Sequence, residues 1–320
     1  MVDHPAEETA IGVGLAERAS DGSSSSQRGG SGRRRLYSQA WARLRRSKVA
    51  LAALIWIAVL VVMAGSADLW VPRVLGDPVA IDTTKVVAQS LKSPSFRHPF
   101  GTDTLGRDIA SRIIYGARVS LVVGVLSVAI MVALGLLLGG LAGYLGGAVD
   151  ALIMRLADVV YSFPYVLFAI ALIAVLGKGF QNVFIAIGLL GWPSIARVFR
   201  SSVLGAKGTE YVEAARGLGA SWWRILVRHI LPNTAGPVIV YGAMSVGGAI
   251  LAESALSFLG MGVQPPSPSW GGMLSESRSY LFTAPWLMLY PGIALLLTVL
   301  AFLLLGDALR DALDVKGKRS

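Results

Sequence analysis

Six long apolar runs, separated by polar segments, constrain the fold of this 320-residue chain more than any other feature of its sequence. A helix needs about 20 mostly apolar residues to cross a bilayer, because each residue adds about 1.5 Å to its length. The runs meet this length or approach it, and only 15% of the residues are charged. We therefore expect an all-α integral membrane protein with six transmembrane helices, at about residues 49–67, 119–141, 159–176, 183–199, 237–259 and 286–305.

The polar segments divide the chain into four parts. Residues 1–32 are rich in serine and glycine and lack apolar periodicity, which is typical of a disordered tail. Residues 33–116 contain a basic anchor, the first span and an outer loop; residues 117–307 contain the other five spans, and residues 308–320 form a charged tail. Because a span follows the anchor directly, we expect the anchor to contact membrane lipid and not nucleic acid. Its basic residues are Arg33, Arg34, Arg35, Arg43, Arg45, Arg46 and Lys48.

The distribution of lysine and arginine predicts which ends of the spans face the cytoplasm, where basic residues are in excess. The basic anchor precedes the first span, and residues 197–228 carry six basic residues against two acidic ones. With six crossings, this excess places both termini and the segment after the fourth span on the cytoplasmic side. A cleaved signal peptide fits less well, because the polar region before the first span is too long.

The segment between the fourth and fifth spans, residues 209–233, has a helical pattern of its own. Thr209 can cap a helix whose first turn carries Glu210 and Glu213, two acidic residues that a helix N-terminus favours. Gly219 offers the left-handed conformation that commonly stops a helix. The face that we expect to be apolar has the spacing i, i+3, i+4, i+7 and consists of Tyr211, Ala214, Ala215 and Leu218.

A second short helix is predicted directly after this stop. Ser221 can cap it, and Leu231-Pro232 is expected to end it. Two short amphipathic helices between membrane spans indicate an element that docks on a partner. The alternative is a helical hairpin that lies on the membrane surface.

The same residues resemble a known family motif. Glu213-Ala214-Ala215, followed by Gly219 and then Leu231-Pro232, resembles the EAA loop of type-I ABC importer permeases. His229 stands where the family usually has isoleucine, and this variant is similar to the C subunit of the dipeptide and oligopeptide permeases. The resemblance covers about residues 33–312 and implies the type-I permease fold, with a cytoplasmic loop that inserts into a cleft on a separate ATPase.

The resemblance also implies roles for the residues of this loop. Ala214 and Ala215 would supply a close-packed docking face, Glu213 a polar contact to the ATPase, and Gly219 the turn between the helices. The full set of expected ATPase-coupling residues is Tyr211, Glu213, Ala214, Ala215, Gly219, Leu231 and Pro232.

The function implied by the resemblance is the import of dipeptides or oligopeptides across the bacterial cytoplasmic membrane by alternating access. The implied partners are a homologous second permease subunit, two ABC ATPases that bind ATP and magnesium, and an extracytoplasmic substrate-binding protein. The same machinery could import nickel, glutathione or another small solute, and an alternative of another class is a membrane enzyme or receptor that acts without ATPases. The sequence contains no GxxxxGK[ST] phosphate loop and no HExxH or GxSxG motif, so we expect no cofactor and no catalytic group in this chain.

Glu253 is an acidic residue within the fifth apolar run. An ionised group inside a bilayer costs about 3 kcal/mol or more unless it is paired or hydrated. Two interpretations stay open: a residue of the translocation pathway, or a helix-end glutamate near the outer interface.

Three local patterns predict how the spans pack and where charges pair. Glycines spaced by four, at Gly135, Gly139, Gly143 and Gly147, are expected to form a face on which another helix packs closely. Pro164 is expected to kink the third span. Arg107, Asp108 and Arg112 are expected to form exposed ion pairs, and Arg155 to pair with Asp158 three residues later.

Overall fold

The computed structural model describes residues 41–42, 44–81 and 86–313. The predicted disordered tail, residues 33–40 and Arg43 of the basic anchor, and residues 314–320 of the predicted C-terminal tail lie outside the described residues. Within the described ranges the fold is all-α, and the only β pairing is an isolated bridge between Thr102 and Asp108. The predicted fold class is therefore confirmed.

Five helices in the described part of the chain are long and apolar enough to cross a membrane. Four of them are single elements: α3 (Lys48–Val74), α5 (Ile109–Leu145), α8 (Phe180–Lys207) and α13 (Trp286–Leu313). The fifth runs without interruption from Trp222 to Phe258 over 37 residues and comprises α10 (Trp222–Arg224), the π-helical turn η1 (Ile225–Ile230) and α11 (Leu231–Phe258).

The third predicted span, residues 159–176, is bent. The expected run 159–176 covers the end of α6 (Gly147–Ser162) and all of α7 (Tyr165–Leu176), which meet at 96°. Pro164 has no N–H to donate and disfavours helical backbone at the residue before it, so Phe163 is extended with φ −98° and ψ 141°. The predicted kink at Pro164 is therefore confirmed, and the described residues contain six crossings only if this bent pair counts as one span.

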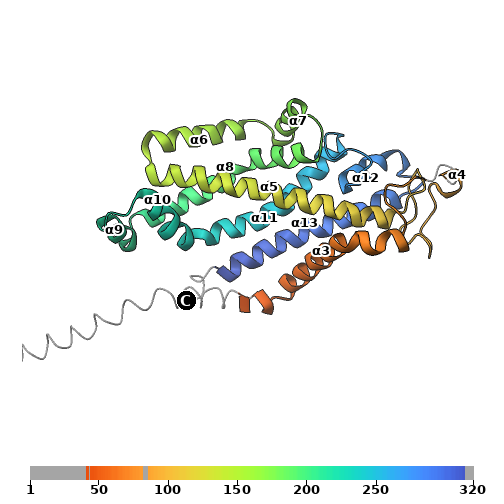
Figure 1. The fold of residues 1–320 in the computed structure, drawn as a ribbon, viewed down its shortest axis with the longest axis horizontal. Coiled ribbons are helices and arrows are strands. Elements are labelled where there is room, and N and C mark those ends of the chain that lie inside the picture. Colours follow the sequence, from red (N-terminus) through yellow and green to blue (C-terminus); the bar gives the residue numbers. More distant parts are fainter. Residues whose placement is uncertain (1–40, 43, 82–85, 314–320) are drawn as a thin grey trace, which may run out of the picture.

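The helices form an elongated bundle with two distinct ends (Figure 1). The small helix α9 (Glu210–Gly217) and α10 lie at one end, which we call the foot end. The opposite end carries α4 (Val86–Gln89), α12 (Trp270–Glu276) and the 3₁₀ turn η2 (Arg278–Tyr280). Leu44 and Ala50 near the start of α3 pack with Ala312 of α13. The start of α3 and the end of α13 therefore lie toward the foot end, and the cytoplasmic position of this end stays a prediction.

Helix α5 packs most closely against α8. A Cβ atom on Gly135 would lie 2.6 Å from the Ile195 side chain, and one on Gly143 would lie 2.8 Å from that of Val203. The predicted glycine face is thus confirmed at these positions and at Gly139, because small residues let two backbones approach closely. Gly147 is not part of it: it lies beyond the end of α5, and a Cβ there would meet no atom within 4 Å.

Three polar contacts join α6 to α8, and we call them the α6–α8 polar ladder. Its rungs are Asp150–Arg200, a two-bond contact with both distances at 2.5 Å, Asp158–Arg197 at 2.7 Å, and Tyr161–Ser194. The predicted pairing of Asp158 with Arg155 is therefore wrong. Sequence spacing along one helix could not show that the partner lies on a neighbouring helix.

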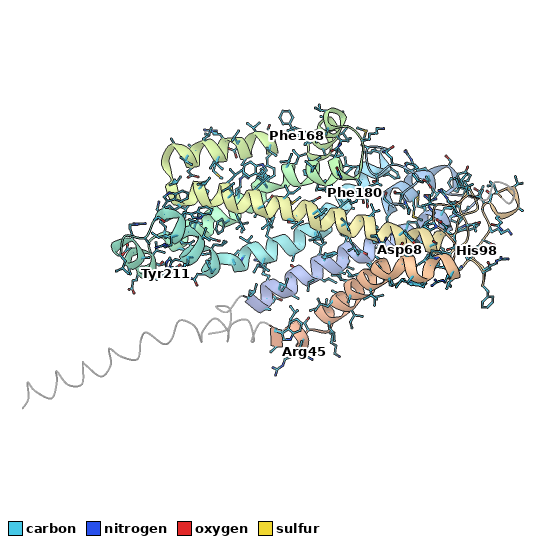
Figure 2. All side chains as sticks on the ribbon, viewed as in Figure 1. Arg45, Asp68, His98, Phe168, Phe180 and Tyr211 are labelled. Atoms are coloured by element: carbon cyan, nitrogen blue, oxygen red, sulfur yellow. The ribbon has the colours of Figure 1, made fainter. Side chains whose placement is uncertain are left out.

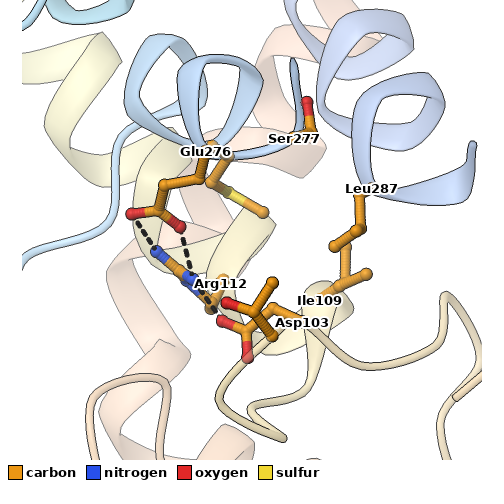
Figure 3. Close-up of a pocket in the computed structure, with 8 residues that line it drawn as sticks. Asp103, Ile109, Arg112, Glu276, Ser277 and Leu287 are labelled. Atoms are coloured by element: carbon orange, nitrogen blue, oxygen red, sulfur yellow. Dashed lines mark hydrogen bonds and ion pairs between the residues drawn. The ribbon is translucent and has the colours of Figure 1, made fainter. Parts of the chain in front are cut away.

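An ionic cluster ties together the end opposite the foot. Arg107 Nε donates to Asp103 at 2.7 Å. Figure 3 shows that Arg112 donates both to Asp103 and to Glu276, the latter at 3.0 and 3.3 Å. Asp108 instead lies 2.9 Å from the His98 ring nitrogen. The expectation of exposed pairs among residues 107, 108 and 112 is wrong, because all three side chains are buried where α5, α12 and the preceding loop meet.

Candidate functional site

Residues 209–230, which we call the foot, comprise α9, a turn, α10 and η1, and project from one end of the bundle. Figure 2 shows Tyr211 at this end and His98 at the other. The foot contacts three membrane helices. The Thr209 hydroxyl donates to the Ala206 carbonyl of α8 at 2.6 Å, and the ring of Trp222 lies 6.5 Å from that of Tyr144 in α5. Ile225 and Ile230 are buried in the main core. A force on the foot therefore reaches α5, α8 and α11 directly.

The start and stop of α9 follow from its sequence. Thr209 occupies the N-cap position, although its hydroxyl donates to the Ala206 carbonyl at 2.6 Å instead of capping α9. At the other end Gly219 N–H donates to the Arg216 carbonyl and Ala220 N–H to the Ala215 carbonyl. This double closure is a Schellman motif, and Gly219 adopts φ +77° as predicted.

The residues that α9 buries are not the four that were predicted to form its apolar face. Val212 and Ala215 are buried against the rest of the subunit. Tyr211, Ala214 and Leu218 are exposed, and Leu218 reaches 89% exposure. Residues three apart lie on the same side of a helix, so Ala215 shares the buried face with Val212 while Ala214 faces away from it. Ala215 thus holds α9 in place, whereas Ala214 lies on the free surface beside the exposed Glu213.

Leu231-Pro232 does not end the second foot helix, which corrects the prediction. The Leu231 N–H donates to the Leu226 carbonyl, a π-helical bond that inserts one extra residue in the turn before Pro232. The Asn233 side chain donates to the His229 carbonyl at 2.7 Å, and the Thr234 hydroxyl to that of Ile230 at 2.9 Å. These side-chain bonds satisfy carbonyls around the proline, so the helix continues into α11.

Glu253 lies in a cage of serine hydroxyls. Ser257 donates to its carboxylate at 2.6 Å, Ser120 of α5 at 3.2 Å and Ser254 at 3.4 Å. Its exposure is 0%, and it has no ion pair among the described residues. In this conformation Glu253 is therefore enclosed between α5 and α11. Ser254 and Ser257, one and four residues after it, were the sequence signal for this cage, but Ser120 on another helix could not be foreseen.

Comparison with known families identifies the type of protein. Residues 135–318, more than half of the chain, match the binding-protein-dependent transport system inner membrane component. Residues 35–91 match the N-terminal transmembrane domain of oligopeptide transport permease C. The chain belongs to the binding-protein-dependent permeases of the oligopeptide C type. It is a permease subunit of an ABC importer, a multi-pass protein of the bacterial inner membrane that is not itself catalytic.

Individual relatives cover nearly the whole permease. The glutathione transport system permease protein GsiD of Pectobacterium atrosepticum is 44% identical over 278 residues, which are 87% of this chain and 90% of the relative. GsiD of Escherichia coli is 45% identical with the same coverage. The fold resembles the MetNI methionine ABC transporter in an inward-facing conformation, with a TM-score of 0.53 at 17% identity over 63% of this chain and 96% of that chain.

Proposed function

We propose that this permease imports glutathione or a similar small peptide, and that the foot is the site where an ABC ATPase docks. The substrate proposal is supported by the 44–45% identity to permeases named for glutathione transport. Glutathione is itself a tripeptide, so it belongs to the predicted substrate class of small peptides. Import of nickel or of long peptides is the alternative that the experiment below must distinguish.

The exposed surface of α9 is the observation that carries the docking proposal. Leu218, Tyr211 and Ala214 leave apolar atoms in solvent beside the acidic Glu210 and Glu213. Exposed apolar residues rimmed by charge mark surfaces that a partner covers. Val212 and Ala215 meanwhile anchor α9 from the other side, so a partner would grip a surface that is fixed to the bundle.

The mechanism that follows is alternating access driven from the foot. Two ATPases, one on this subunit and one on a homologous permease, would close on ATP and draw the two feet together. The helix from Trp222 to Phe258 is about 55 Å long at 1.5 Å per residue, so it would carry this movement across the membrane. Both termini and the foot would then lie in the cytoplasm, and an extracytoplasmic binding protein would deliver substrate to the opposite end.

Reconstitution tests the docking and the substrate separately. The complete complex in liposomes should take up labelled glutathione with ATP and binding protein, and unlabelled small peptides should compete better than Ni²⁺. Ala214→Glu should lose the ATPase on co-purification. Ala88→Glu is the matched control, because Ala88 is an exposed alanine in α4 at the opposite end. Retention of the ATPase by Ala214→Glu would overturn the docking site, and uptake of Ni²⁺ but not glutathione would overturn the substrate.

A further inference from the structure

The α6–α8 polar ladder lies deep enough to need an explanation beyond helix packing. Its depth can be read from α5, which packs along α8 beside it. Gly143 of α5 lies against the Arg200 carbonyl and Val203, Gly139 against Ala196, and Gly135 against Ile195. The apolar run of α5 ends near residue 141. Arg197 directly follows Ala196, which lies against Gly139, so the Asp158–Arg197 rung is level with the apolar run. The Tyr161–Ser194 rung, beside residue 135, lies about 9 Å further from the foot than the end of that run.

These polar groups do not point into the interior of the subunit. The side chains of Arg197 and Asp158 are 46% and 55% exposed, and Tyr161 is half-exposed. The Arg197 guanidinium also lies 4.7 Å from the centre of the Tyr161 ring. Charged side chains at such a depth rarely face lipid; they face a bundle interior or a water-filled cavity and mark the routes of substrates.

We propose that the α6–α8 polar ladder lines the aqueous substrate path of the assembled importer, and that Arg197 and Asp158 bind the charged ends of the substrate. The second half of this inference rests on the proposed function. A glutathione-like peptide carries carboxylates and an ammonium group. The planar guanidinium of Arg197 matches a carboxylate with two parallel hydrogen bonds, and Asp158 matches the ammonium.

The three rungs follow one another along α6, from the foot end toward the break at Pro164. The first rung, Asp150–Arg200, lies nearest the foot, and the rungs continue along α6 as far as the break at Pro164. There the chain turns by 96° into α7, and the rings of Phe163 and Phe168 lie 5.1 Å apart. The ladder thus extends from the foot end to an aromatic corner, with an acidic and a basic group at its middle rung.

Water access can be measured with a single introduced thiol, because the chain contains no cysteine. The Ser194→Cys variant, in the complete complex in liposomes, is treated with a membrane-impermeant, water-soluble thiol reagent, and labelling is read on this subunit. The control is Val62→Cys in α3, an apolar helix position that is 67% exposed. We expect labelling of Ser194→Cys that glutathione slows, and none of Val62→Cys. Labelling of Ser194→Cys by a lipid-soluble maleimide alone would overturn the aqueous path.

Substrate contact is tested by kinetics of uptake. Arg197→Ala should raise the KM for glutathione uptake at least tenfold, because the substrate carboxylate loses its guanidinium partner. Arg197→Asp combined with Asp158→Arg restores the ion pair but exchanges its charges, so uptake should stay impaired if the pair binds substrate. Recovery of normal uptake in this double variant would overturn substrate binding and leave only a structural pair.

The outcomes for this inference and for the proposed function can be told apart. If the wild-type complex imports another solute and Ser194→Cys is still labelled from water, glutathione is refuted as the substrate and the aqueous path stands. If the wild-type complex imports glutathione and Ser194→Cys is not labelled, the path along α6 and α8 is refuted and the proposed function stands.

Discussion

Gly139 of α5 lies directly against Ala196 of α8: a Cβ atom on Gly139 would sit 2.8 Å from the Ala196 Cα, a separation that real Cβ atoms do not adopt. The two helices can therefore come this close only because residue 139 has no side chain. Because α8 leads into the foot and carries one side of the α6–α8 polar ladder, this contact supports both proposed sites.

Gly139→Ala should force α5 and α8 apart and destabilise the subunit by about 1–3 kcal/mol, the usual cost of an overpacked interior. Gly205→Ala in α8 is the control, because a Cβ there meets no atom within 4 Å and alanine favours the helix by about 0.5–1 kcal/mol. Thermal unfolding of the purified complex measures both. Equal midpoints for the two variants would show that the close approach does not limit stability.

Gly219→Val should impair transport while the complex still assembles. A Cβ at this position meets open space, so the cost is the left-handed backbone, at φ +77°, which is about 1–2 kcal/mol for a residue other than glycine and is greatest for β-branched ones. Gly217→Val, two residues earlier in α9 and also without neighbours within 4 Å, lacks this strain. ATP-driven uptake should fall for residue 219 and not for residue 217; normal uptake by Gly219→Val would count against a coupling role.

Arg112→Ala should destabilise the end opposite the foot by about 3 kcal/mol, because it removes one of the partners of the buried Asp103 and leaves Glu276 without its hydrogen-bonded guanidinium. Glu276→Gln should cost less than about 1 kcal/mol, because the Glu276 side chain is 43% exposed. The unfolding temperatures of the two variants, measured at low and at high salt, test these two expectations. A larger effect of Glu276→Gln than of Arg112→Ala would contradict this ordering.

Glu253→Leu should destabilise the subunit by about 1–3 kcal/mol, because three buried serine hydroxyls lose their acceptor. Glu253→Gln keeps one oxygen acceptor and an amide that the hydroxyls can bind, so its stability and its uptake should stay near those of the wild type. Strongly reduced uptake by Glu253→Gln at unchanged unfolding temperature would instead support the translocation-pathway interpretation.

The elements that depend on local pattern were predictable. The long apolar helices follow from length and hydropathy, the turn at Gly219 from the need for positive φ, and the close approach of another helix at Gly139 from spacing by four. The break at Pro164 was placed correctly, but its 96° angle depends on how α7 packs and not on the proline alone.

The contacts between helices could not be predicted from one sequence. Asp158 has a basic neighbour three residues away, yet it pairs with Arg197, which is 39 residues distant. Arg112 and Glu276 are 164 residues apart, and Ser120 and Glu253 are 133 apart. Periodicity also placed Ala214 and Ala215 on one docking face. In the structure Ala215 is buried against the rest of the subunit, and a single sequence does not show which side of α9 packs there.

The π-helical turn at residues 225–230 is the irregular part of the helix that runs from Trp222 to Phe258. Its hydrogen bonds are irregular, and it precedes the apolar run that begins at residue 237. A helix that flexes within hydrocarbon would strand backbone groups that no solvent can reach, whereas carbonyls released in this turn can be rehydrated. A change in the backbone at this turn would therefore leave the apolar part of the helix, from residue 237 onward, regular.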